Sequence, residues 1–456
     1  MSLAQKEIKP TRQQEAILRF RGVCNILSSG TRGSAKTVTL MLDVIDRCRA
    51  LGHEARPLVI RESHAGLLEI MDEIFLMTSA AFGNVTRSKA DSQLHLPNGA
   101  TITFTQINDI DSYAKHQGKS YCSLYQDKRG NYPVTALGFI AKLRSNLRVP
   151  PGQRPHIHCT VNPFGRAHGD VLRNHISKAP FWQPYEDESG EWWVNTHTSY
   201  KDNPFIDTES YKRQLIASAA GDSNLFAAWE RGEWSTLGGS MFAPPWDPKV
   251  HIIKTPPFLG PAYYRIGADF GLSAPSVGLL GCKLRQPVGP YPAGSTIVLD
   301  EVSTCIPGSL SQGDGSPPQV LAEMFKEMMA SNNLRNIPVT IDDMRGLNTA
   351  ETVVTLLAEN GISARKPVNK NRAQGWIRIR AGLHNAVEGK GAGGLYITER
   401  CVGLLATLPD APRSPNRPAD IDPRWDEDHH CDALSYLTSE FGMPPARSGH
   451  HIGTSY

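Results

Sequence analysis

The stretch SSGTRGSAKT, residues 28–37, decides the fold of the first half of the chain. It has the outline of a phosphate-binding loop: a glycine, four residues, Ala35 where glycine is usual, and a closing Lys-Thr pair. Residues 23–27 before it are typical of a short buried strand. Residues 38–52 after it have apolar residues at helical spacing and end in a glycine. Strand, loop and helix in this order are the context that such a loop requires.

The loop predicts phosphate binding by backbone N–H groups at a helix N-terminus. Lys36 would reach the β- and γ-phosphates, and the hydroxyl of Thr37 would bind Mg²⁺. We expect Ala35 to adopt helical φ and ψ angles at the helix start. The plainer alternative is an ordinary glycine-rich turn before a helix. The residues expected to contact nucleotide in the loop are Gly30, Gly33, Ser34, Ala35, Lys36 and Thr37.

Further strands are predicted in the first half, and they end in polar residues. They end near Arg61, Asp127 and Thr160, and residues 92–106 form a hairpin that turns at Asn98-Gly99. Polar strand ends of this kind predict a mainly parallel sheet with its site along the carboxyl edge. Asp127 is then placed as a second acid near Mg²⁺, although a solvated turn acid is the plainer alternative.

Length and composition are those of a globular protein with more than one domain. The chain has 456 residues, so two or three domains are expected. The sequence has no run of about 18 apolar residues, so we expect no transmembrane helix. The first residues lack the apolar core of an export signal, so we expect no export. The eight cysteines are scattered without a CxxC pair, which favours reduced thiols. A net charge of +3 neither requires nor excludes nucleic acid.

A proline- and glycine-rich stretch marks the expected domain boundary. Residues 238–262 read as a connector with one short strand at 249–253. We therefore expect a first domain over residues 1–237 and a second over residues 263–456.

The second half carries acidic residues at the ends of predicted strands and in a late helix. If residues 425–437 are helical, two of the acids lie one turn apart on one face. Facing carboxylates repel unless a divalent metal neutralises them, and two metals about 4 Å apart would clamp a phosphodiester. The alternatives are solvated caps, or a zinc site at 429–431. The acids are Asp269, Glu301, Asp342 or the adjacent Asp343, Asp428 and Asp432.

With these motifs in hand, the chain resembles the large terminase subunit of tailed bacteriophages, the motor that pumps DNA into the capsid. The resemblance covers nearly the whole chain in the family's order. Its motifs are PTRQQ (10–14), GTRGSAKT (30–37), TVNPFGRAH (160–168), TSYKDNPFID (198–207), FAAWERGEWSTLGGSMF (226–242) and DHHCDALSY (428–436).

In the first half, the resemblance implies a P-loop ATPase domain. Gln13 would contact adenine, Asn162 would sense the γ-phosphate, and Arg32 would stabilise charge in its own subunit. The family usually has glutamate after the acid that matches Asp127, as the residue that activates water. This chain has Lys128 instead, and a protonated lysine cannot accept a proton.

In the second half, the resemblance implies an RNase H-like α/β nuclease domain. Asp269 matches the acid of the first strand, and Asp342 best matches the acid of the later strand. Asp428 matches the closing motif, with Asp432 a close second. Glu301 fits the family's hairpin acid less firmly.

The resemblance also implies partners and setting. The ligands are ATP and Mg²⁺, with Mn²⁺ in the nuclease site. The partners are double-stranded DNA, a portal protein and a small terminase subunit, and the chain would form a ring on the portal. The setting is the cytoplasm of a bacterial host, with no membrane involved. Two other functions stay open at this stage. One is a helicase-nuclease of DNA repair or recombination, and the other is a nucleotide-binding scaffold whose ATPase is silenced by Lys128.

Overall fold

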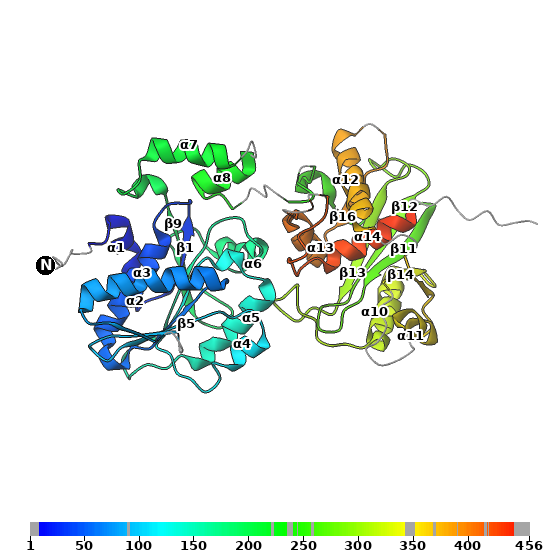
Figure 1. The fold of residues 1–456 in the computed structure, drawn as a ribbon. Coiled ribbons are helices and arrows are strands. Elements are labelled where there is room, and N and C mark those ends of the chain that lie inside the picture. Colours follow the sequence, from blue (N-terminus) through cyan, green and yellow to red (C-terminus); the bar gives the residue numbers. More distant parts are fainter. Residues whose placement is uncertain are drawn as a thin grey trace, which may run out of the picture. The chain divides into compact units, whose positions relative to one another are not determined.

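The protein forms two compact units, Met1–Gly239 and Ser240–Tyr456 (Figure 1). The computed structural model describes residues 9–88, 92–219, 223–234, 240–243, 245–256, 260–342, 352–367, 371–389, 391–414, 417 and 419–441.

The first unit is built on a nine-stranded sheet with a parallel centre. In spatial order its strands are β3 (Thr86–Ser88), β4 (Gln93–His95), β5 (Thr101–Thr105), β2 (Pro57–Ile60), β6 (Ser123–Gln126), β7 (His156–Thr160), β1 (Asn25–Gly30), β9 (Trp192–Thr198) and β8 (Pro184–Glu186). The strands from β5 to β9 in this order are parallel. Strands β3, β4 and β8 pair antiparallel at the edges. The central strands β1, β2, β6 and β7 are buried along their whole length, as parallel strands covered on both faces are.

Helices cover both faces of this sheet, and the strand side chains alternate between them. Val59 and Tyr125 pack with α2 and α3 on one face, whereas Leu58, Ile60 and Leu124 pack with α5 and α6 on the other. Figure 1 shows α2 and α3 beside each other in blue. The helices are α1 (Arg12–Leu18), α2 (Lys36–Leu51), α3 (His64–Phe82), α4 (Ile110–Ala114), α5 (Val134–Lys142), α6 (His168–Asn174), α7 (Thr208–Ser218) and α8 (Ser223–Arg231).

The expected elements of this half are present, with shifted boundaries. Strand β1 extends to Gly30, so the first residues of the quoted loop are strand, and α2 begins at Lys36 rather than at residue 38. Gly52 caps α2 with a φ of 55°. The hairpin of β4 and β5 turns at Asn98-Gly99, where Gly99 has a φ of 87°.

The second unit has a seven-stranded mixed sheet. In spatial order its strands are β10 (Ile252–Ile253), β16 (Leu395–Thr398), β13 (Thr296–Ser303), β12 (Val277–Leu284), β11 (Ala262–Asp269), β14 (Val339–Ile341) and β15 (Ala364–Arg365). Strands β11, β12 and β13 form an antiparallel meander, and the other pairings are parallel.

Helices again cover both faces. In β12, Leu279 packs with α12, α13 and α14, and its neighbour Leu280 packs with α10 and α11. The helices are α9 (Pro248–His251), α10 (Pro318–Ser331), α11 (Val353–Glu359), α12 (Arg372–Glu388), α13 (Val402–Thr407) and α14 (His429–Phe441). Among the described residues, 3₁₀ turns occur at Gly52–Glu54, Arg129–Asn131, Leu143–Asn146, Ile176–Lys178, Tyr200–Asp202 and Leu408–Asp410.

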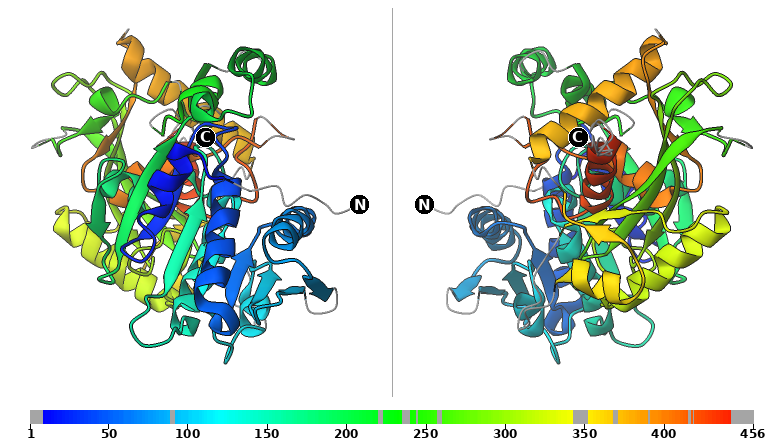
Figure 2. Two further views of the ribbon diagram at one scale, coloured as in Figure 1. Left: turned by 90° about the vertical axis from the view of Figure 1, so that its left-hand side faces the viewer. Right: turned by 90° about the vertical axis from the view of Figure 1, so that its right-hand side faces the viewer.

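Helix α14 lies directly on β11 because β11 has a glycine at the crossing. A Cβ atom on Gly267 would stand 2.3 Å from the backbone nitrogen of Leu437 and 2.4 Å from the carbonyl oxygen of Ala433. Figure 2 shows α14, in red, against the strands of this sheet. The close approach brings the start of α14 to the carboxyl end of β11, where Asp269 is the last residue.

The stretch that we expected to be a connector contains ordered elements. Its segment 248–253 forms α9 and the two-residue strand β10, which pairs with β16. Met241 and Phe242 are buried in the hydrophobic core of the second unit. All eight cysteines are free. Among the described residues, no helix combines the length and apolar character needed to cross a membrane.

Candidate functional site

The phosphate-binding loop joins β1 to α2 at the carboxyl edge of the first sheet. Gly30 has a φ of 132°, and a Cβ atom there would stand 2.0 Å from the carbonyl oxygen of Thr198 on β9. Gly33 also has a positive φ, 75°. Both positions therefore need glycine, the first for close packing and both for their backbone angles.

Ala35 is left-handed, with φ 59° and ψ 25°, so the expectation of helical angles at this residue is wrong. The chain turns here from the loop into the first turn of α2, and successive right- and left-handed residues of this kind point their N–H groups into an anion-binding concavity. A left-handed conformation costs an L-residue roughly 1–2 kcal/mol, whereas glycine adopts it freely. Glycine is usual at this position because it adopts the left-handed angles without strain, and Ala35 adopts the same angles at a cost in conformational energy.

Lys36 is buried and folds back over its own loop. Its Nζ donates to the carbonyl oxygen of Thr31 at 2.6 Å and to Ser34 Oγ at 3.0 Å. Burial lowers the pKa of Lys36 to about 7, while Asp127 acts to raise it and Arg32 acts to lower it further. Phosphate oxygens beside Nζ would favour the charged ammonium, so Lys36 would contribute most to binding when a polyphosphate is in the site.

Asp127 follows β6 and joins three elements through its fully buried carboxylate. Its Oδ1 accepts hydrogen bonds from Thr37 Oγ1 at 2.9 Å and Thr160 Oγ1 at 2.5 Å. Its Oδ2 lies 2.7 Å from Nη1 of Arg61. Because the Thr37 hydroxyl donates to Asp127, its lone pairs stay free for a Mg²⁺ ion. Asp127 therefore holds the Thr37 hydroxyl in place and is itself paired with Arg61.

A cavity of about 1160 Å³ opens in front of the loop. In it, Arg32 lies flat over the ring of Trp229 at 4.0 Å, and Gln13 Nε2 donates to Asp202 Oδ2 at 3.2 Å. The residues lining it include the predicted nucleotide contacts Gln13, Arg32, Gly33, Ser34, Ala35, Lys36, Thr37 and Asn162, and the apolar or aromatic side chains of Val38, Leu42, Phe205, Ile206, Tyr211, Leu225 and Trp229. The structure therefore brings most of the predicted residues of this half to one cavity.

Two residues of this cavity bear on water activation. Asn162 Oδ1 is buried and has no hydrogen-bond partner within the described part of the chain, so it is available to a ligand or water. Lys128 lines the cavity from a left-handed position, with a φ of 54°, and its N–H donates to Thr160 Oγ1 at 2.9 Å. Among the described residues that line the cavity, Asp202 is the one with a carboxylate, and Gln13 already donates a hydrogen bond to it.

The second predicted site lies at the carboxyl end of β11. Asp269 is the last residue of β11, and Asp342 follows β14. These strands are parallel neighbours with Ala268 opposite Ile341, so the two acids leave the sheet side by side.

The start of α14 adds two more acids and a histidine. His429 Nδ1 donates to Asp269 Oδ2 at 2.8 Å. Asp428 precedes the helix and Asp432 lies one turn into it, and a single guanidinium nitrogen of Arg372 contacts both carboxylates. The helix begins at His429 rather than near residue 425, so Asp428 stands just before it, and the N–H of Asp432 donates to the carbonyl oxygen of Asp428 at 2.9 Å, which places the two acids one turn apart.

The electrostatics of this cluster fit a divalent metal. Burial raises the pKa of Asp269, and Asp428 and Asp342 raise it further, while His429 lowers it. Burial also raises the pKa of Asp432 well above its usual range, and Arg372 only partly opposes this. Crowded, partly buried carboxylates of this kind offer hard oxygen ligands, which suit Mg²⁺ or Mn²⁺.

Three sequence expectations fall elsewhere. The carboxylate of Glu301 accepts the backbone N–H groups of Gly403 at 2.5 Å and Leu404 at 3.0 Å, so the structure gives it the role of a cap on α13. Asp343 lies outside the described residues. The zinc alternative at 429–431 gains no support, because His429 binds Asp269 while Cys431 is buried in the hydrophobic core.

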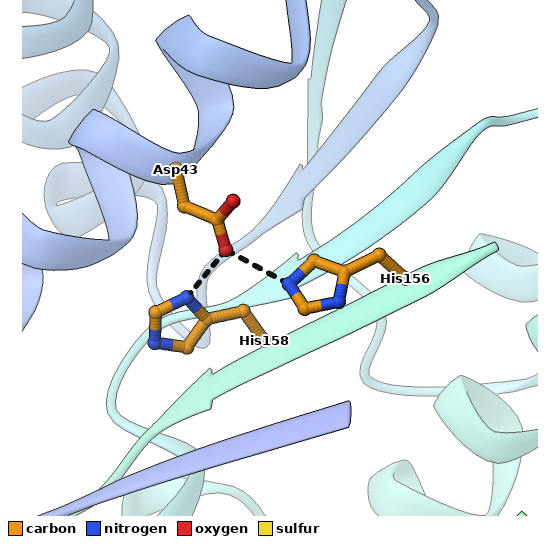
Figure 3. A group of neighbouring side chains, drawn as sticks. All are labelled: Asp43, His156 and His158. Carbon is orange, nitrogen blue, oxygen red and sulfur yellow. Dashed lines mark hydrogen bonds and ion pairs between the residues drawn. The ribbon is translucent and has the colours of Figure 1, made fainter. Parts of the chain in front are cut away.

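A buried cluster below the phosphate-binding loop was not predicted from the sequence. Asp43 Oδ2 accepts hydrogen bonds from His156 Nε2 and His158 Nδ1, both at 2.8 Å (Figure 3). Arg21 Nη1 lies 3.5 Å from Asp43 Oδ1, and His158 Nε2 is 2.9 Å from Ser28 Oγ on β1. Burial acts to raise the pKa of Asp43, but the two histidines lower it well below its usual range. These groups form a charge-compensated network that fixes α2 to β7 and β1.

The comparisons with known proteins agree with this geometry. Residues 24–233 match the family model described as phage terminase large subunit. Among solved structures, the chain is similar to the HK97 bacteriophage large terminase, with 10% identity, a TM-score of 0.51 and coverage of 95% of each chain. It is also similar to the large terminase of a thermophilic bacteriophage in complex with ADP, with 14% identity, a TM-score of 0.42, and coverage of 94% of this chain and 98% of that chain. No curated protein matches the sequence. The likeness to the HK97 structure confirms the predicted α/β fold class.

The left-handed angles of Ala35 lead to a first prediction. Ala35→Gly should leave the free energy of unfolding unchanged or raise it by up to about 1 kcal/mol, because relief of the left-handed strain offsets the greater freedom of glycine in the unfolded chain. Ala50→Gly, at an exposed helical position of the same α2, should lower it by about 0.5–1 kcal/mol. Denaturant unfolding of both variants measures the contrast, and equal losses would contradict a strained Ala35.

The Asp43 network leads to a second prediction. Asp43→Asn should lower the free energy of unfolding by about 3–5 kcal/mol, because it leaves buried donors facing an amide. Asp46→Asn removes a half-exposed partner of the same Arg21 and should cost less than about 1 kcal/mol. The folded-state pKa of Asp43 lies below its ordinary value, so the contribution of this carboxylate is complete at neutral pH and is lost below about pH 4. Burial lowers the pKa of His158, so stability begins to fall below about pH 6.5, where the unfolded histidine takes up a proton. Urea unfolding at pH 7.5 compares the two, and similar small losses would show that the network does not hold the fold.

Proposed function

We propose that this chain, whose residues 24–233 match the model described as phage terminase large subunit, is such a subunit and that it packages viral DNA and cuts it. ATP hydrolysis in the first unit drives double-stranded DNA into a procapsid. The second unit cuts the DNA concatemer with divalent metal ions. In this assignment, residues 1–237 form the ATPase domain and 263–456 the nuclease domain, and 238–262 connect them, with Met241, Phe242 and β10 packed into the second unit.

One observation carries the proposal. A single chain holds two sites for phosphate chemistry in two separate sheets: a cavity with a phosphate-binding loop, and a cluster of buried carboxylates. The first site suits a nucleotide polyphosphate, and the second suits metal-assisted cleavage of a phosphodiester.

In the ATPase site, the loop and the N-terminus of α2 hold the phosphates of ATP. Lys36 binds the β- and γ-phosphates, and Thr37, oriented by Asp127, binds Mg²⁺. Arg32 neutralises charge on the transferring phosphoryl group, and Asn162 senses it. Gln13 reads the base.

In the nuclease site, four carboxylates would hold Mg²⁺ or Mn²⁺: Asp269, Asp342, Asp428 and Asp432. A bound metal would supply an activated water and stabilise the leaving oxygen of the phosphodiester. His429 donates to Asp269 and keeps that carboxylate oriented.

The proposal includes the partners that packaging needs. The chain acts on double-stranded DNA as a ring on the portal protein, with a small terminase subunit, in the cytoplasm of a bacterial host. Contacts with DNA would be mostly to phosphates, with little reading of base sequence.

A second candidate function follows from Lys128. This ammonium lines the cavity at the position where a water-activating carboxylate is expected. The chain could then be a nucleotide-gated scaffold that binds ATP without turning it over. Phosphate release measured with and without DNA separates the two functions: stimulation by DNA supports the motor, and no release in either condition supports the scaffold.

A third prediction concerns Lys128. Lys128→Glu should raise ATP hydrolysis by at least about tenfold, because general-base catalysis contributes about 10²–10⁴-fold. Lys128→Gln removes the charge without supplying a base, so it should give much less of the gain. Nucleotide affinity should be nearly the same in all three proteins, since the loop is unchanged. Steady-state turnover and titration calorimetry on the three proteins test this prediction. If Lys128→Glu does not raise the turnover, the residue that activates water lies elsewhere.

A fourth prediction tests the independence of the two sites. Lys36→Ala should abolish ATP turnover and leave metal-dependent plasmid cutting largely intact. Asp269→Asn should do the reverse, because the amide keeps the shape of the side chain but loses the charge that holds the metal. Both activities are measured on both full-length variants. Plasmid cutting that survives in a folded Asp269→Asn protein would rule out the nuclease site as drawn.

A further inference from the structure

The acid cluster of the second unit already contains a cation, the guanidinium of Arg372. Arg372 is the first residue of α12, where Asn371 is the N-cap. Its Nη2 lies 2.7 Å from Oδ2 of Asp428 and 3.2 Å from Oδ2 of Asp432. One positively charged nitrogen thus bridges the two carboxylates from α14.

This bridging position is chemically significant. Two carboxylates that converge on one point are what a divalent metal requires, and a guanidinium hydrogen-bonded to the same oxygens competes with it. An arginine remains charged at every working pH, so Arg372 cannot release the two carboxylates by losing a proton. It has to move away instead.

The surroundings of Arg372 allow that movement. About a third of its side chain is exposed, against 16% for Asp428 and 12% for Asp432. Its guanidinium carbon lies 5.4 Å from the ring centre of Trp376, one turn further along α12. Trp376 is fully buried and donates to Asp420, so the helix stays anchored when the arginine moves.

We propose that Arg372 is an internal competitor for the divalent metal of the nuclease site. It holds Asp428 and Asp432 together while no metal is bound, and it must release at least one of them before a metal binds. The site therefore needs a higher metal concentration than its carboxylates alone would set. This inference rests on the proposed nuclease function.

The test measures Mn²⁺ binding to the full-length protein by titration calorimetry without nucleotide. The heat that Asp269→Asn removes identifies binding at the nuclease site. Arg372→Gln should bind Mn²⁺ about tenfold more tightly, because an adjacent arginine favours the free carboxylate by about that factor or more. Arg400→Gln breaks a comparable pair with Asp300 in the same unit and should leave the affinity unchanged.

Melting temperatures give a second readout that does not depend on activity. Without metal, Arg372→Gln should melt below the unchanged protein, because its carboxylates repel one another. With saturating Mn²⁺ it should gain more than the unchanged protein does. Should Arg372→Gln fail to fold, Arg372→Lys serves in both measurements, since an ammonium lacks the planar fork that holds the pair. It should then bind Mn²⁺ more tightly than the unchanged protein, by a smaller factor.

The outcomes separate the two proposals. An affinity that is unchanged or weaker in the Arg372 variant, with the Asp269-dependent heat still present, overturns the role of Arg372 and leaves the nuclease proposal standing. A complete absence of that heat in both the unchanged protein and the variant shows that the acids bind no metal, and both proposals then fall.

Discussion

The buried carboxylate of Asp127 is the constraint on which the geometry of the first unit depends. A fully buried carboxylate costs several kcal/mol unless it is paired and hydrogen-bonded, and its partners come from three elements: Thr37 on α2, Thr160 on β7 and Arg61 after β2. All three reach it only when β2, β6 and β7 pair in their observed parallel register. The same contacts fix Thr37 and therefore the mouth of the phosphate-binding loop, so the position of a bound polyphosphate follows from the satisfaction of one charge.

The second unit gathers its acids by a similar use of strand ends but balances them differently. Asp269 and Asp342 leave adjacent parallel strands, and Gly267 lets α14 approach closely enough to add its own carboxylates. His429 serves Asp269 and one nitrogen of Arg372 is shared, so the pKa values of Asp269 and Asp432 remain raised. Burial raises the pKa values of Asp269 and Asp432, whereas two histidines lower that of Asp43 despite its burial, and this difference is why we propose the metal at the acid cluster of the second unit.

What could be predicted from the sequence divides along physical lines. Strand-end residues such as Asp127 and Asp269 were placed correctly, because alternation and apolar runs define where a buried strand ends. The left-handed angles of Ala35 were not, since they arise from the path of the chain and not from alanine's own preference. The contact of Asp43 with His156 joins residues more than a hundred positions apart, so no local pattern reports it. The capping role of Glu301 escaped for the same reason: α13 begins a hundred residues later.

Under the proposed function, the opposite charge balance of the two sites sets the order in which each would bind its ligands. Around the nucleotide cavity, Arg32 and Lys128 are cationic, Lys36 would become so beside a phosphate, and the charge of Asp127 is already matched by Arg61. A polyphosphate is attracted there without help, and it can bring Mg²⁺ with it. In the second unit, Asp428 and Asp432 share one guanidinium and Asp269 contacts one imidazole, so the cluster would repel a DNA phosphate until a metal binds. In the proposed function, a nucleotide would therefore bind the first site without a prior metal, whereas in the second site a metal would have to bind before DNA is cut.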